Sequence, residues 1–77
     1  MDKFVIVTRN STYLVEKTPG GIMRVVARAT FVRGNDWPFT GTVVDPDKLA
    51  VGARPLLKSD DGIFARTTEI QSIVKVV

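Results

Sequence analysis

The chain has 77 residues, carries a net charge of +3 and contains neither cysteine nor histidine. Its length is that of one domain, so residues 1–77 are expected to fold as a single unit, and disulfides and the usual zinc ligands are excluded. The mild positive charge falls short of a nucleic-acid-binding signature. No apolar run approaches the roughly 20 residues that a membrane-spanning helix requires.

Short strands separated by turns are predicted along the first part of the chain. Residues 3–8 are rich in valine, isoleucine and phenylalanine, with apolar side chains on both faces, which is typical of a central strand. Asparagine and serine within residues 9–11 favour a turn, and residues 12–17 are expected to return as a second strand. Proline followed by two glycines in residues 18–21 is the clearest turn signal.

Residues 22–31 are predicted to form the longest strand, because their two faces differ in polarity with a period of two. One face is wholly apolar and is expected to point into the core. The other face carries Arg24 and Arg28, which are therefore expected to point outward. The side chains assigned to the core face are Met23, Val25, Ala27, Ala29 and Phe31.

Turn residues also divide the second half of the chain. Residues 32–39 contain glycine, asparagine, aspartate and proline, which interrupt any strand there. We expect residues 40–45 to form a short fourth strand, and residues 45–48 to form a turn or a short helical turn. Residues 53–59 are expected to form a fifth strand, with Pro55 at a sheet edge or at the strand start.

The remaining residues complete the predicted sheet. Asp-Asp-Gly at residues 60–62 is a hairpin signal, and residues 63–66 and 69–77 are expected to be extended. Two isoleucines three positions apart in the last segment break strict alternation, which a β-bulge or a helical turn near residues 67–68 would reconcile. The whole pattern predicts an all-β fold, a small SH3-like barrel of five or six short antiparallel strands.

Three short motifs carry a resemblance to other proteins. They are Thr-Arg-Asn-Ser-Thr-Tyr at residues 8–13, Val-Gly at residues 51–52 and Thr-Thr-Glu-Ile-Gln-Ser-Ile at residues 67–73. Through these motifs the chain resembles short, uncharacterised small β-barrel proteins of actinobacteria, other Gram-positive bacteria and their phages. Those proteins often open with a Ser-x-Tyr turn and close on a Thr-Ser-x-Val-x-x-Ile segment. The resemblance implies an actinobacterial or phage setting and transfers no activity and no site residue.

The composition argues against an enzyme. Histidine, the commonest general base, and cysteine, the strongest nucleophile, are both absent. Two pairs of carboxylates remain, Asp45 with Asp47 and Asp60 with Asp61, but both lie where turns use aspartate to bond the local backbone. Neither pair extends into a calcium-binding loop, so no metal and no cofactor are expected.

Basic residues give the first candidate binding surface. Arg24 and Arg28 share a face of the third predicted strand, and Arg54 and Lys58 have the same spacing on the fifth. If these strands were neighbours, the four cations would form a stripe that could contact nucleic-acid phosphates. The alternative is a solvated outer face whose long side chains cover apolar surface. Aromatic side chains for base stacking are absent from this face.

Trp37 and Phe39 give the second candidate surface. They follow a glycine, an asparagine and an aspartate at residues 34–36, which indicates a loop. Aromatic side chains on loops are favoured anchors for protein partners. The alternative is that one or both of them fold back and plug an end of the barrel.

The apolar segment at residues 73–77 must be paired, because an open apolar strand aggregates. It can pair with the first strand or with a second copy of the chain. A hydrophobic content of 44% in so small a domain favours association, so a homodimer is predicted.

Taken together, these features predict a non-enzymatic interaction module. Its partner would be a protein, a second copy included, in a host-interacting or accessory role, and a nucleic-acid-binding barrel is the alternative. Residues 1–4 lack the features of a signal peptide, so we expect a soluble protein of the bacterial or phage-infected cytoplasm with no membrane contact.

Overall fold

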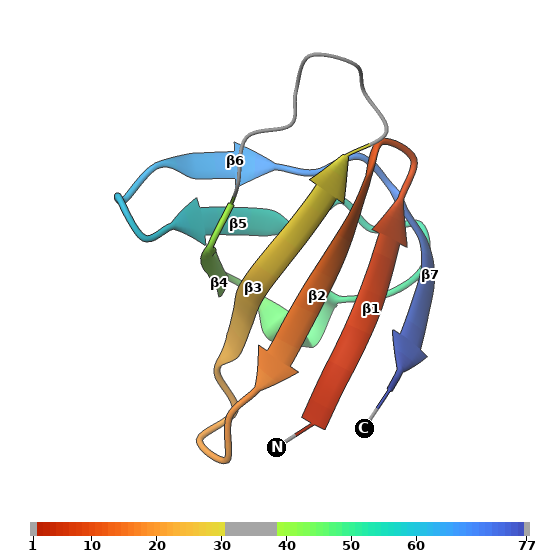
Figure 1. Ribbon diagram of the computed structural model, residues 1–77. Helices are drawn as coiled ribbons and strands as arrows, with labels where there is room; N and C mark the ends of the chain where they lie inside the picture. Colours follow the sequence, from red (N-terminus) through yellow and green to blue (C-terminus); the bar gives the residue numbers. More distant parts are fainter. Residues whose placement is uncertain (1, 31–38, 77) are drawn as a thin grey trace.

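The computed structural model describes residues 2–30 and 39–76. These residues form a single antiparallel sheet of seven strands in the order β6-β5-β4-β3-β2-β1-β7, which curls into a half-barrel (Figure 1). The only helical element described is the single-turn 3-10 helix η1 (Pro46–Lys48). The all-β class and the small barrel-like architecture are therefore confirmed. The strands are β1 (Asp2–Thr8), β2 (Ser11–Lys17), β3 (Met23–Thr30), β4 (Gly41–Val43), β5 (Leu56–Ser59), β6 (Phe64–Arg66) and β7 (Ile70–Lys75).

The strand count is seven rather than five or six, because the last two predicted segments form separate strands at opposite edges of the sheet. β6 pairs with β5, whereas β7 pairs with β1. In Figure 1 the long strands β3, β2, β1 and β7 lie side by side, and the short strands β4, β5 and β6 cross behind them. No helix among the described residues is long and apolar enough to cross a membrane.

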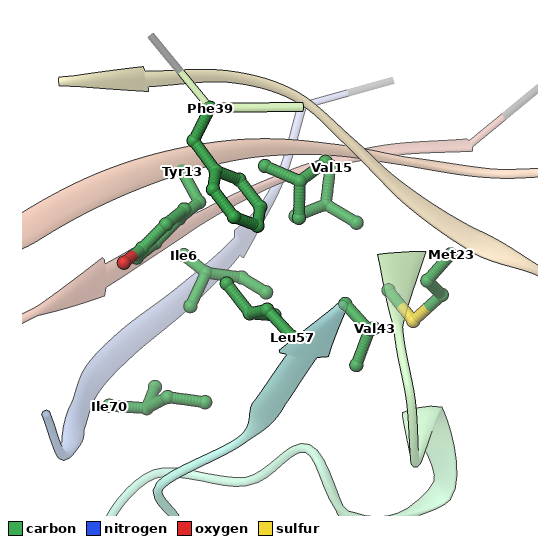
Figure 2. Close-up of a cluster of buried hydrophobic side chains, with 9 residues drawn as sticks. Ile6, Tyr13, Val15, Met23, Phe39, Val43, Leu57 and Ile70 are labelled. Carbon is green, nitrogen blue, oxygen red and sulfur yellow. The ribbon is translucent and has the colours of Figure 1, made fainter. Parts of the chain in front are cut away.

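The core lies on the inner face of the curled sheet. Figure 2 shows side chains from the long strands meeting Val43 of β4 and Leu57 of β5. Phe4, Leu49 and Ile73 pack against this cluster from its border. The buried hydrophobic side chains among the described residues are Ile6, Tyr13, Val15, Met23, Val25, Phe39, Val43, Leu57 and Ile70.

An extra residue in β3 changes which side chains face the core. Val15 of β2 pairs with Val25, but Leu14, the residue before Val15, pairs with Ala27. Val26 is left between the two pairs, which is the arrangement of a β-bulge. The alternation of side chains along β3 is therefore inverted beyond Val26.

This bulge corrects the face prediction for the third strand. Met23 and Val25 are buried, as expected. Ala27 and Ala29, also expected in the core, are exposed, because they lie beyond the extra residue and point to the outer face. Phe31 lies outside the described residues.

A second register shift occurs where β7 meets β1. Val7 pairs with Ser72, but the adjacent Thr8 pairs with Ile70, so Gln71 is the extra residue. The irregularity expected at residues 67–68 therefore lies in β7 itself, at a position that allows Ile70 to be buried.

The segment before β5 ties the sheet to the start of β7. The Ile70 amide donates to the Ala53 carbonyl (2.9 Å), and the Gly52 amide donates to the Ile70 carbonyl (2.8 Å). The Thr67 amide donates to the Pro55 carbonyl (3.1 Å). These bonds hold residues 52–55 in place outside β5, which consequently begins at Leu56 rather than at residue 53.

Candidate functional site

The basic stripe predicted from four cations is not assembled. β4 lies between β3 and β5, so the two strands that carry the cations are not neighbours. Arg24 pairs with Thr42 of β4, which in turn pairs with Lys58 of β5, so these two cations share a row but are two strands apart. Arg54 precedes β5 and is not among the residues paired in that row.

Arg24 is engaged in a bidentate ion pair. Its two terminal nitrogens each donate to one carboxylate oxygen of Asp60 at 3.1 Å, and the Thr40 hydroxyl donates to the same carboxylate at 2.6 Å. The hydrogen bonds from Arg24 and then from Thr40 lower the pKa of Asp60, and the bond to Asp60 raises the pKa of Arg24. This pair neutralises the charge of Arg24 on the outer wall.

Arg28 does not lie on the outer face with Arg24. It pairs with Tyr13 of β2, a core residue, and its Nε atom is buried. The bulge at Val26 is the reason, since the extra residue turns Arg28 to the inner face. The prediction that Arg28 points outward is therefore wrong.

Lys58 is exposed on β5 beside β6. Its ammonium lies 5.5 Å from the centre of the Phe64 ring, and the two residues are paired across the strands. At an exposed site such a cation–π contact contributes about 0.5–1 kcal/mol. Lys58 and Arg24 thus each have a local partner within the fold.

The two aromatic residues predicted as anchors have different outcomes. Phe39 is 6% exposed and belongs to the core cluster, so the alternative that it plugs the barrel is confirmed and it offers no exposed anchor (Figure 2). Its burial follows from the small size of the domain, which recruits a large apolar side chain from the segment before β4. Trp37 lies outside the described residues.

Three other arginines gather at one end of the half-barrel, and we call them the arginine cluster: Arg9, Arg54 and Arg66. Arg66 donates to the Arg54 carbonyl at 2.7 Å, and Arg54 Nε donates to the Thr67 carbonyl at 3.1 Å. Beside Arg9, the Asn10 amide donates to the Thr68 hydroxyl at 3.3 Å. Hydrogen bonds therefore connect the β1–β2 turn, the segment before β5 and the β6–β7 connection.

Two shallow hollows border the arginine cluster. Arg9 and Arg54 line one of about 240 Å³, and Arg54 and Arg66 line another of about 220 Å³. Of the acids described, Glu69 borders the first and Asp45 the second. The ion pairs found among the described residues, Lys3–Glu16, Arg24–Asp60 and Lys75–Asp2, involve none of the three arginines.

No motif in the sequence predicts that these three arginines meet. Arg9 and Arg66 belong to no predicted binding surface, and the sequence predicts Arg54 on a strand face. Arg9 lies far from the other two in the chain. Hydrogen bonds that residues 52–55 and Asn10 make with the β6–β7 connection bring the three segments together.

The outer face of β7, β1, β2 and β3 carries a continuous row of apolar side chains, which we call the apolar row. Val5 pairs with Val74 on one side and with Leu14 on the other, and Leu14 pairs with Ala27. These pairs place Val74, Val5, Leu14 and Ala27 across all four strands. This face is turned toward the viewer in Figure 1, opposite the core.

Two further rows flank the apolar row on the same face. On one side lies a row that we call the hydroxyl-bearing row, in which strand pairing aligns Ser72, Val7, Thr12 and Ala29. On the other side strand pairing aligns the charged residues Lys3, Glu16 and Arg24.

The two carboxylate pairs lie in turns. Asp45 directly precedes η1 and Asp47 lies within it. Asp60 and Asp61 follow β5. No group of three or more potential metal-ligating side chains is found in the part of the chain that the structure describes.

Comparisons of the chain with protein-family models, with curated proteins and with solved structures found no match. The apolar row and the arginine cluster are therefore the two surfaces of the described residues that point to a function.

Proposed function

We propose that this protein is a non-enzymatic interaction module that docks a protein through the outer face of β7, β1, β2 and β3. The observation that carries the proposal is the apolar row, which crosses four strands on the face opposite the core. In an antiparallel sheet with one solvated face, the side chains on that face are normally polar. Here Val5 and Leu14 are only half-buried and Val74 is 54% exposed.

The occupant that we assign to this face is a second copy of the chain. A two-fold axis parallel to the apolar row would place the row of one copy on the row of the other. The same operation sets the charged row of each copy against the hydroxyl-bearing row of its partner, so like charges do not meet. The outer faces of two copies can therefore pack against each other without repulsion between like charges.

The size of the face indicates which class of interface it can form. Four strands about 4.8 Å apart and seven residues of about 3.3 Å each span roughly 400 Å² in projection. A standard interface takes about 800 Å² of accessible surface from each partner. We therefore expect a weak dimer, with dissociation in the micromolar range, rather than an obligate one.

The biological setting is proposed from the sequence. The resemblance to short actinobacterial and phage proteins supports an accessory or host-interacting role. The lack of cysteine fits a reducing cytoplasm.

Sedimentation equilibrium of the full chain at micromolar concentrations tests the proposal. The wild type should exceed the monomer mass of 8.5 kDa, with little dependence on salt. Val74→Glu and Ala27→Glu, at opposite ends of the apolar row, should both restore the monomer, because each places a charge in the interface. Val51→Glu is the matched control, since Val51 is 67% exposed in a turn away from this face.

Circular dichroism melts of the same variants verify that each remains folded. A wild type that is monomeric at these concentrations would refute the self-docking proposal. A dimer that survives both substitutions in the apolar row would refute this face as the interface.

A further inference from the structure

Three positive charges at one end of the half-barrel have no carboxylate partner among the described residues. Arg9, Arg54 and Arg66 are all exposed, and none lies within ion-pair distance of an aspartate or glutamate there. Three other described cations, Lys3, Arg24 and Lys75, do have a carboxylate partner. Like charges that lie close together repel one another, and a bound anion would offset that repulsion.

The hydrogen bonds of the arginine cluster leave most of its donors available. A guanidinium has five N–H donors in a planar fork that matches the oxygens of phosphate. Arg66 uses Nη1 on the Arg54 carbonyl, and Arg54 uses Nε on the Thr67 carbonyl. These bonds orient two of the side chains, and no hydrogen bond within the described residues occupies the side chain of Arg9.

The two hollows adjoin through Arg54, which borders both of them. One hollow has Arg9 on its other side, and the second has Arg66. A single phosphate would occupy one hollow only, whereas a chain of phosphates can contact all three guanidinium groups. We propose that the arginine cluster binds successive backbone phosphates of a single-stranded nucleic acid.

The form of the surface favours a single strand over a duplex. The cluster is built from a turn, the segment before β5 and a strand end, and none of these is a helix or ribbon that could enter a groove. Small barrels bind single strands through a basic groove that follows the backbone, combined with aromatic stacking of bases, and the arginine cluster supplies the first of these two parts. Phe64, the exposed aromatic side chain on β6, is held beneath Lys58, so the contacts are expected to be to phosphates rather than to bases.

This site is independent of the docking face proposed above. It uses the β1–β2 turn, the segment before β5 and the end of β6, whereas the docking face uses the middle of the long strands. The dimer variant Val74→Glu should therefore retain nucleic-acid binding per chain, apart from a small general effect of its added negative charge.

Fluorescence anisotropy with a labelled oligothymidylate of about 15 nucleotides tests the proposal. Binding should weaken with salt, and three phosphate contacts predict a slope of log K against log salt of roughly −2. Arg9→Gln is the main variant, because the Arg9 side chain makes no hydrogen bond with the described residues. It should weaken binding by roughly 3- to 10-fold and reduce the slope by about 0.7.

Arg66→Gln should have a similar effect, and Arg24→Gln is the matched control. Arg24→Gln makes the same change in net charge, but its charge is already engaged by Asp60. Glu69→Gln removes the acid that borders the Arg9–Arg54 hollow and should tighten binding by roughly two- to threefold. Melting curves of all four variants check that the fold is retained.

Several outcomes would overturn the proposal. One is no binding of the oligonucleotide at low salt, and another is equal weakening by Arg9→Gln and Arg24→Gln. Saturable binding of inorganic phosphate without binding of the oligonucleotide would refute the strand as the ligand. Equal affinity for polyglutamate of matched charge would refute phosphate recognition.

Discussion

Arg28 lies directly opposite Tyr13 across β3 and β2, on the face of the sheet that holds the core. Val25 is buried, so strict alternation along β3 would place both Arg24 and Arg28 on the outer face. The single extra residue at Val26 thus moves a guanidinium from the outer wall to the inner face and two alanines the other way.

Replacing Phe39 by alanine should strongly destabilise the fold. Phe39 is 6% exposed within the core cluster, and removing a buried phenylalanine side chain costs about 3–5 kcal/mol. Phe64→Ala is the matched control, because Phe64 is 57% exposed and should lose at most about 1 kcal/mol. Urea denaturation measures both, and similar losses for the two variants would contradict the assignment of Phe39 to the core.

Replacing Gly41 by alanine should also destabilise the protein, through backbone crowding. An added Cβ would meet the backbone of the neighbouring strand β5, with the Cα of Ser59 at 2.9 Å and the carbonyl of Lys58 closer still. Overpacking of this kind costs about 1–3 kcal/mol. Gly20→Ala meets only the Thr18 hydroxyl at 3.9 Å and should leave the thermal midpoint nearly unchanged. A Gly41 variant as stable as the Gly20 variant would show that the two strands can separate without cost.

The ion pair between Arg24 and Asp60 should make stability depend on pH in the acid range. The pKa of Asp60 is lowered in the folded state, so its contribution is present above the unfolded pKa and is lost as pH falls through the folded value. Asp60→Asn should therefore be less stable than the wild type at pH 7, and the difference should shrink below about pH 4.

Urea midpoints across this range measure the effect of Asp60→Asn. Asp61→Asn provides the control, because Asp61 is an exposed neighbour without an ion pair among the described residues. The prediction fails if the deficit of Asp60→Asn stays constant from neutral to acid pH.

The fold class could be predicted from the sequence because its turn signals are local. Proline and glycine at residues 18–21 and Asp-Asp-Gly at residues 60–62 do separate strands in the structure. The faces of β3 beyond Val26 could not be predicted, because the bulge depends on pairing with β2. Strand order also depends on contacts between segments distant in the chain. The position of β4 between β3 and β5, the two strands predicted to carry the basic residues, therefore could not be predicted from the sequence.

The arginine cluster was beyond sequence reasoning for the same physical reason. Arg9 follows β1, and Arg66 ends β6. Their placement on either side of Arg54 depends on hydrogen bonds that residues 52–55 and Asn10 make with the β6–β7 connection, which no local pattern encodes.

The pairing of β1 with β7 has a consequence for the order in which the protein folds. β1, β2 and β3 are joined by short turns and can zip together early, whereas Phe4 must find Lys75 across nearly the whole chain. Closing so long a loop is slow, so we expect folding in milliseconds to seconds with the docking of β7 among the last events. Until β7 arrives, Ile6 and its neighbours along β1 present an open backbone edge, and this interval is when the chain is most exposed to aggregation.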